Sequence, residues 1–103
     1  MEGETNYTLS VLAAIDLRGI ADFTIKKFGV QQSENYRDSF TIIFNKLGKH
    51  PEIGREYIAI KNVMVSRYRF KAHSIFFFPL DEKIFIVRVL GNDMNFLKHL
   101  KSK

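Results

Sequence analysis

The sequence of 103 residues contains no cysteine, which excludes disulfide bonds, thiolate nucleophiles and cysteine-ligated zinc sites. This composition is what a reducing compartment permits, so we expect a cytoplasmic protein. A long apolar run is also lacking, because the longest, from Ile75 to Leu80, is far too short to cross a bilayer. The N-terminus, Met1-Glu2-Gly3-Glu4, has acidic residues where a secretory signal would have basic ones. We therefore expect neither export nor membrane insertion.

Hydrophobic residues make up 46% and aromatic residues 14% of the chain, which is enough for one apolar core. No internal repeat, low-complexity tract or interdomain linker divides the sequence. We therefore predict a single domain spanning residues 1–103. The formal net charge of +5 favours an anionic partner, although charge alone does not decide function.

The N-terminal half has the pattern of a short strand followed by two helices. Alternating polar and apolar residues predict a strand over Tyr7 to Val11 that ends near Leu12. Apolar residues then recur at helical spacing in two segments: Ala13, Leu17, Ile20, Phe23 or Thr24, and Phe28; then Tyr36, Phe40, Ile43, Phe44 and Leu47. Gly29 and Gly48 are placed to end these helices. Their short connection predicts an antiparallel hairpin whose apolar stripes face a sheet.

The C-terminal half is typical of a β-meander. Three strands joined by two tight turns are predicted: Met64 to Phe70, His73 to Phe78 and Ile84 to Leu90. The segment from Lys49 to Asn62 contains Pro51 and Gly54 and is predicted to be a loop. A final amphipathic segment, Met94 to Leu100, is predicted to be either a short helical turn or an ordered tail. The expected fold class is α+β, with an N-terminal strand and an antiparallel helical hairpin packed on a small antiparallel sheet that ends in a three-strand meander.

Three cations stand two residues apart at the end of the first meander strand. If this segment is a strand, Arg67, Arg69 and Lys71 project from one face, and Tyr68 and Phe70 from the other. Such a row suits nucleic acid or an acidic protein better than a metal or a small apolar ligand. It is equally typical of a solvated strand edge that discourages aggregation, so both interpretations stay open.

Arg88 interrupts the apolar face that Ile84, Ile86 and Leu90 would form, so its guanidinium is predicted to be partly buried. A buried guanidinium requires a carboxylate or an anionic ligand. Three carboxylates are candidate internal partners: Asp16, Asp38 and Asp93. The alternative is that Arg88 contacts a macromolecular partner.

Several short motifs, taken in order, resemble one protein family. They are Asp16-Leu17 with Ile20 and Phe23, Phe28-Gly29 with Tyr36, Pro51-Glu52-Ile53-Gly54-Arg55, Arg67, His73-Ser74-Ile75-Phe76-Phe77, Ile86-Val87-Arg88-Val89-Leu90, and Met94 with His99 and Leu100. Together they cover nearly the whole chain and resemble the ParE toxins of the RelE/ParE toxin–antitoxin superfamily. The resemblance implies the same α+β fold that the periodicity predicts.

The resemblance also implies a function and partners. ParE-type toxins poison DNA gyrase by stabilising its cleaved complex with DNA, and a cognate antitoxin neutralises them. We therefore expect a hetero-oligomer with an acidic, ParD-like antitoxin, DNA gyrase as the target, and an indirect contact with DNA. RelE-type relatives instead cut messenger RNA on the ribosome, and one scaffold hosts both activities. An attenuated member that only binds its antitoxin is a third alternative.

Cleavage of RNA would need a general acid, a general base and cations around the phosphate. The cations are present, but RelE-type ribonucleases often place Tyr or His just after the last strand, where this chain has Gly91-Asn92-Asp93-Met94. His50, His73 and His99 are isolated in the sequence, so each is predicted to be structural rather than catalytic. We predict a protein that acts by binding, with no catalytic residues, no cofactor and no metal.

An apolar sheet face is predicted to bind the antitoxin. In the middle meander strand Ile75 and Phe77 face one way and Phe76 and Phe78 the other, so the helices can cover only one of these faces. A face of Phe76 and Phe78 with Phe85 and Val87 suits an antitoxin segment. The alternative is that these side chains form the underside of the helical hairpin.

The C-terminal segment is associated with gyrase poisoning in ParE-like toxins, and here it departs from the family pattern at Gly91, Asp93 and Asn95. Weakened toxicity or another target is therefore an open alternative. The residues predicted to bind the target or the antitoxin are Arg67, Arg69, Lys71, His73, Phe76, Phe78, Arg88, Met94, Phe96 and His99.

Overall fold

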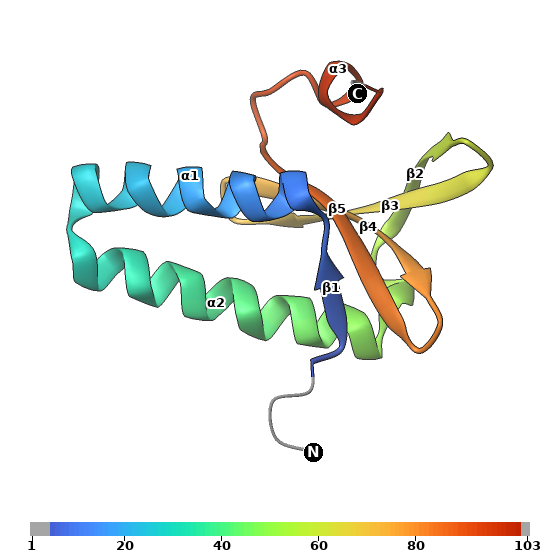
Figure 1. Cartoon of the computed structure of the whole chain (residues 1–103), viewed down its shortest axis with the longest axis horizontal. Helices are drawn as coiled ribbons and strands as arrows, with labels where there is room; N and C mark the ends of the chain where they lie inside the picture. Colours follow the sequence, from blue (N-terminus) through green and yellow to red (C-terminus); the bar gives the residue numbers. More distant parts are fainter. Residues whose placement is uncertain (1–4, 102–103) are drawn as a thin grey trace.

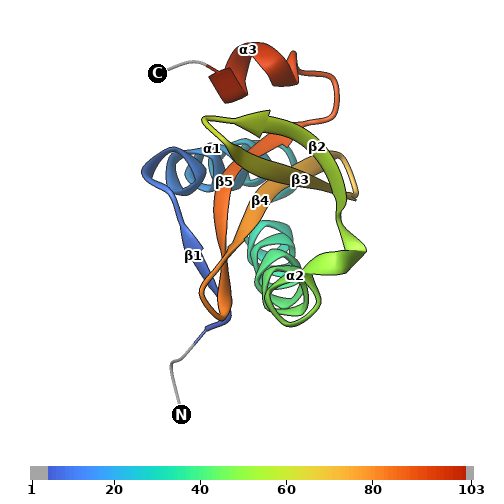
Figure 2. The ribbon, with the colours of Figure 1, turned by 90° about the vertical axis from the view of Figure 1, so that its right-hand side faces the viewer.

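A computed structural model describes residues 5–101 of the chain. It contains, in order, β1 (Tyr7–Leu9), α1 (Val11–Phe28), α2 (Val30–Lys49), the 3-10 helix η1 (Pro51–Ile53), β2 (Arg55–Ile60), β3 (Val63–Phe70), β4 (His73–Leu80), β5 (Lys83–Gly91) and α3 (Phe96–Lys101). The antiparallel hairpin of α1 and α2 lies against one face of a five-stranded sheet (Figure 1). Figure 2 shows α3 on the side of the sheet opposite to α2. The predicted α+β class is confirmed.

The strand order of the sheet is β1-β5-β4-β3-β2. Strands β2 to β5 form an antiparallel meander, whereas β1 pairs parallel with β5. The sheet is therefore mixed, and the meander has one strand more than predicted. The additional strand, β2, lies in the segment predicted to be a loop. Its alternation is weak because, on this edge strand, only Ile58 and Ile60 are half-buried.

Ser10 separates β1 from α1 and makes the first strand shorter than predicted. Its Oγ accepts a hydrogen bond from the Ala13 amide at 2.9 Å, which caps the helix, and donates one to the Val87 carbonyl at 2.7 Å. Gly29, with a φ of 95°, ends α1 as predicted and joins it directly to α2. The second helix then continues through Gly48, where the sequence predicts its end.

The buried face of α1 differs from the predicted stripe. Ala13 and Thr24 are buried, whereas Phe23 and Phe28 are 60% and 64% exposed. Of the two alternatives that the spacing leaves at the third turn, Thr24 is therefore correct. Helical spacing could not decide between them because α1 carries apolar residues on its outer face as well as its inner face.

The main core lies between the hairpin and the sheet and contains Ala13, Phe40, Ile43, Phe44, Leu47, Ile75, Phe77, Ile84, Ile86 and Val89. A smaller cluster on the α3 side of the sheet contains Val65, Phe76, Leu90 and Leu100. A β-bulge makes Val87 an extra residue opposite Phe76 and Phe77, so side chains beyond it change faces. Ile86 therefore faces the hairpin and Leu90 faces α3, although the sequence predicts them on one face.

Candidate functional site

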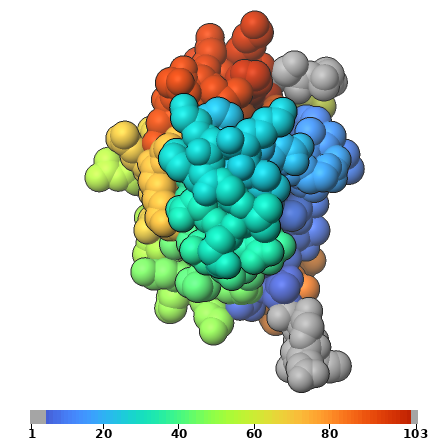
Figure 3. Space-filling view, turned by 90° about the vertical axis from the view of Figure 1, so that its left-hand side faces the viewer, coloured from blue at the N-terminus to red at the C-terminus, as the bar shows by residue number. Residues whose placement is uncertain are grey.

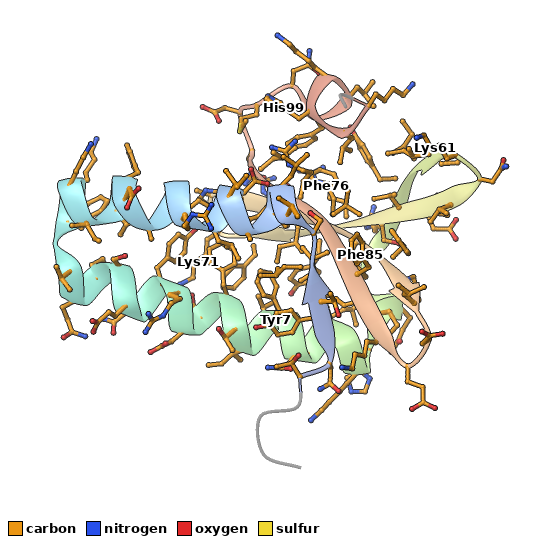
Figure 4. The ribbon with its side chains drawn as sticks, viewed as in Figure 1. Tyr7, Lys61, Lys71, Phe76, Phe85 and His99 are labelled. Carbon is orange, nitrogen blue, oxygen red and sulfur yellow. The ribbon has the colours of Figure 1, made fainter. Side chains whose placement is uncertain are left out.

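The structure separates the predicted row of cations into two places. Arg67 and Arg69 belong to β3 and lie on the face turned toward α3, while the aromatic residues that alternate with them pack against the main core, as predicted. Lys71 instead occupies the β3–β4 turn with a φ of 57°, which breaks the alternation. Its Nζ lies 5.5 Å from the centre of the Tyr36 ring, on the hairpin side (Figure 4). The prediction of one shared face is therefore wrong for Lys71.

Arg67 is held in place from two sides. Its Nε donates a hydrogen bond of 2.9 Å to the Oγ of Ser74 on β4, and this hydroxyl donates in turn to the side-chain oxygen of Asn92 at 2.6 Å. The guanidinium also lies over the Phe96 ring of α3, with 4.8 Å between Cζ and the ring centre. A guanidinium fixed in this way loses little conformational freedom when it binds an anion.

Arg88 forms an ion pair with Asp16 of α1, one of its three predicted partners. Nε and Nη2 donate to the two carboxylate oxygens at 2.8 and 2.9 Å, and Nη1 donates to the His99 carbonyl at 3.2 Å. Asp16 also accepts a hydrogen bond of 3.0 Å from the Val89 amide. The hydrogen bond to Asp16 raises the pKa of Arg88. The structure therefore supports an internal ion pair, the first of the two alternatives for this residue.

Phe76 has no exposed surface, so the predicted contact with a partner is closed to it as long as α3 stays in place. Its ring packs between Tyr57 of β2 and Phe96 of α3, with ring centres 5.5 and 5.0 Å apart. Figure 4 shows Phe76 on the side of the sheet that faces α3. Phe78 is half-buried beside Phe85, with 5.4 Å between ring centres. The short C-terminal helix thus covers the part of the face around Phe76.

His73 begins β4 on the hairpin side, where its Nδ1 lies 2.8 Å from the hydroxyl of Tyr36. Burial lowers the pKa of His73, although the carboxylates of Asp93 and Asp16 oppose this effect. Burial also raises the pKa of Tyr36, against a backbone hydrogen bond at Ala72, so the hydroxyl stays protonated and can donate to a neutral imidazole. His73 therefore has an orienting partner that the sequence did not predict.

We expect the protein to lose stability as the pH falls through the ordinary histidine range. The lowered pKa means that, between the folded value and the unfolded value of about 6.5, the unfolded chain binds more protons at His73, so the free energy of unfolding decreases there with falling pH. Urea unfolding between about pH 8 and about pH 5 should show a larger loss for the wild type than for His73→Gln, whose amide does not titrate. Equal losses in both proteins would contradict this prediction.

The predicted residues of the C-terminal segment have different surroundings. Phe96 packs against the small cluster on the α3 side of the sheet. Met94 precedes α3, and its Sδ accepts a hydrogen bond of 3.2 Å from the Gly91 amide. The backbone carbonyl of His99 binds Arg88, whereas its imidazole has no hydrogen-bond partner within residues 5–101. The helix α3 therefore packs its apolar side against the sheet and exposes its other side to solvent.

A groove of about 760 Å³ lies between α1, the β3–β4 turn and the chain at the end of β5. Ile15, Phe23 and Phe28 contribute apolar side chains to it. The β3–β4 turn and the chain after β5 also line the groove and contribute three of the predicted residues: Lys71, His73 and Met94. Figure 3 views the molecule toward the outer end of the hairpin, with these two segments beside it. Sequence reasoning missed this surface because it placed Phe28, and Phe23 as one of two alternatives, on the stripe that faces the sheet.

A second hollow, of about 410 Å³, lies at the β2–β3 edge and is more polar. Arg67 and Arg69 line it together with Arg55, which stands directly opposite Arg67 in the strand register. Sequence reasoning missed Arg55 as a site residue because its segment was predicted to be a loop. The sequence signal that could have found it is the dipeptide Lys61-Asn62 between two apolar segments. In the structure it forms a tight hairpin turn with positive φ values of 51° and 69°.

Within residues 5–101, no group of three or more His, Cys, Asp or Glu side chains is arranged to hold a metal ion. No helix in this part of the chain is both long enough and apolar enough to cross a membrane.

Comparisons with known proteins agree with the fold. A family model described as "ParE toxin of type II toxin-antitoxin system, parDE" matches residues 7–96, from the first residue of β1 to the first residue of α3. Among solved structures, the chain is similar to one described as "Chromosomal ParDE TA system from P. aeruginosa", with a TM-score of 0.69 and 17% sequence identity over 84% of this chain and 95% of that chain. At this identity the likeness shows the fold alone. No curated protein matches the sequence.

Proposed function

Because the chain belongs to the ParE toxin family of type II toxin–antitoxin systems, we propose that it inhibits DNA gyrase by binding, and that a ParD-like antitoxin neutralises it by docking in the groove along α1. The observation that carries this proposal is the apolar outer face of α1. Monomeric soluble proteins rarely expose large contiguous apolar patches, and such patches mark sites of protein–protein interaction. The proposal places the toxin in the cytoplasm, where gyrase acts.

The groove has the chemistry of a site for an acidic amphipathic helix. Phe23 and Phe28 offer apolar contact area, and Lys71 contributes a positive charge on the opposite wall. Lys27 adds a second charge, since its Nζ lies 5.6 Å from the centre of the Phe23 ring. An antitoxin helix would bury its apolar stripe against α1 and place acidic residues near these ammonium groups. Asp93, which also lines the groove, would favour a neutral or basic residue at its own position.

Action by binding is supported by the surroundings of the two histidines nearest to the predicted cations. His73 is hydrogen-bonded to Tyr36 on the hairpin side of the sheet, whereas Arg67 and Arg69 lie on the opposite face, toward α3. His99 belongs to α3, and Arg88, which contacts its carbonyl, is already paired with Asp16. General acid–base catalysis needs a proton-transferring group within hydrogen-bond reach of the reacting atoms and cations that are free to hold the phosphate.

The test is a gyrase supercoiling reaction with purified toxin and its cognate ParD-like antitoxin. We expect the wild type to inhibit supercoiling and to accumulate linear DNA, and the antitoxin to restore activity. Phe23→Asp should still inhibit gyrase but should need at least about tenfold more antitoxin for half-maximal rescue, because a central apolar contact contributes about 2 kcal/mol or more to binding.

The matched control is Ile42→Asp, which adds the same charge at an apolar residue that is 71% exposed on α2 and lies outside the groove. Its antitoxin requirement should equal that of the wild type. An unchanged requirement in Phe23→Asp would reject the groove as the antitoxin site. Transcript cleavage on translating ribosomes, without any effect on gyrase, would instead favour the ribonuclease alternative.

A further inference from the structure

Two arginines face each other across the edge of the sheet. Arg55 on β2 and Arg67 on β3 are direct partners in the antiparallel register, and Arg69 follows Arg67 on the same face of β3. Like charges placed directly opposite each other destabilise a sheet. Together, Arg55, Arg67 and Arg69 form the arginine cluster. Their arrangement lowers stability unless something neutralises the charge.

No carboxylate within the described residues neutralises the arginine cluster. The ion pairs within 4.0 Å in residues 5–101 are Arg37–Asp38, His50–Glu52 and Arg88–Asp16, and none of them includes a member of the cluster. Glu56 lines the same hollow, but its carboxylate also lies beyond this distance from the cluster. The charge is therefore available to an anion from solution.

Arg67 is prepared for such an anion by its neighbours. Its Nε is occupied by Ser74, and one face of its guanidinium is covered by the Phe96 ring. Neither Nη atom has a hydrogen-bond acceptor in the part of the chain that the structure describes. The Nη groups form the end of the guanidinium fork, the geometry that binds two oxygens of a phosphate at once.

We propose that the arginine cluster binds phosphate groups of a nucleic-acid backbone. The hollow offers three guanidinium groups, which is typical of a surface that positions a phosphate backbone. It differs in this respect from the α1 groove, where large apolar side chains suit a protein segment. The cluster binds phosphate whether or not gyrase is the target of the toxin, so the inference goes beyond the proposed function.

Fluorescence anisotropy with short labelled oligonucleotides tests this site on the full chain without gyrase. Single-stranded DNA, double-stranded DNA and RNA of one sequence distinguish the sources of the phosphate. At about 0.1 M salt, Arg55→Ala and Arg67→Ala should each weaken binding of the preferred oligonucleotide roughly tenfold and reduce the slope of log K against log salt by about 1, the value for one lost phosphate contact. Arg55 is exposed on an edge strand, so Arg55→Ala tests the site even if Arg67→Ala folds poorly.

The control is Arg37→Ala, which removes one equal charge from α2, where the arginine side chain is 70% exposed. We expect its affinity and salt slope to match those of the wild type. Binding that is undetectable in the wild type, unchanged in Arg55→Ala, or weakened equally in Arg37→Ala would overturn the proposal. A toxin that fails to inhibit gyrase but shows the expected losses here would reject the gyrase proposal alone.

Discussion

Asp16→Ala is expected to lower the free energy of unfolding by about 3–5 kcal/mol, because it leaves Arg88 as a largely buried charge without a carboxylate. The two side chains are only 12% and 13% exposed, and they share two hydrogen bonds. The same substitution also removes the acceptor of the Val89 amide. Breaking such a pair costs far more than the pair itself contributes, because the remaining charge stays desolvated.

Urea unfolding measures this effect, and Asp38→Ala is the matched control. Asp38 pairs with Arg37 at 3.7 Å, but both side chains are about 70% exposed, so its loss should cost less than about 1 kcal/mol. The double substitution Asp16→Leu with Arg88→Met should recover much of the lost stability, since it removes both charges and keeps the apolar volume. Similar costs for Asp16→Ala and Asp38→Ala, or no recovery in the double variant, would show that the buried pair does not act in this way.

The ion pair also connects the two candidate surfaces. Asp16 lines the groove on α1, and Arg88 reaches the last helix through the carbonyl of His99. The helix α3 in turn supplies Phe96, which covers one face of the Arg67 guanidinium. A chain of direct contacts therefore runs from the proposed antitoxin site to the proposed phosphate site. Substitutions at Asp16 should disturb both surfaces, whereas Phe23 and Arg55 are exposed and allow each surface to be tested by itself.

Strong periodicity in the sequence predicts most of the elements correctly. The hairpin follows from regularly spaced apolar residues and from Gly29, and the faces of β4 follow from simple alternation. The sequence also offers Asp16 as one of three candidate partners of Arg88, because a partly buried guanidinium requires a carboxylate or another anion nearby. The predictions of helices and strands depend on local patterns, and the physical forces behind them act over a few residues.

The errors arise where tertiary contacts or a single dihedral angle decide the outcome. Lys71 leaves the arginine row because its own φ is positive, and Leu90 changes faces because Val87 forms a bulge. The edge strand β2 was not predicted because solvent covers most of its side chains and leaves little alternation. The exposure of Phe23 depends on which of the apolar sides of α1 meets the sheet. None of these facts has a signature in the spacing of residues alone.

Two glycines within helices look alike in the sequence but should respond to alanine with opposite signs. A Cβ at Gly48 of α2 would collide with the backbone carbonyl and Cβ of Asn6. Asn6 cannot easily move away, because its amide donates to the Asn45 side chain at 3.0 Å and its carbonyl accepts from the Ile84 amide at 3.1 Å. A Cβ at Gly19 of α1 would meet nothing within 4 Å.

Gly48→Ala is therefore expected to destabilise the protein by about 1–3 kcal/mol through overpacking, whereas Gly19→Ala should stabilise it by up to about 1 kcal/mol, the usual gain of alanine over glycine within a helix. The midpoints of urea unfolding should move in opposite directions from the wild type. Gly48→Ala without any loss of stability would mean that the segment before β1 yields to the new methyl group, and a loss in Gly19→Ala would contradict the expected gain. Because Asn6 directly precedes β1, the close approach at Gly48 lets the edge strand β1 lie against the end of the hairpin.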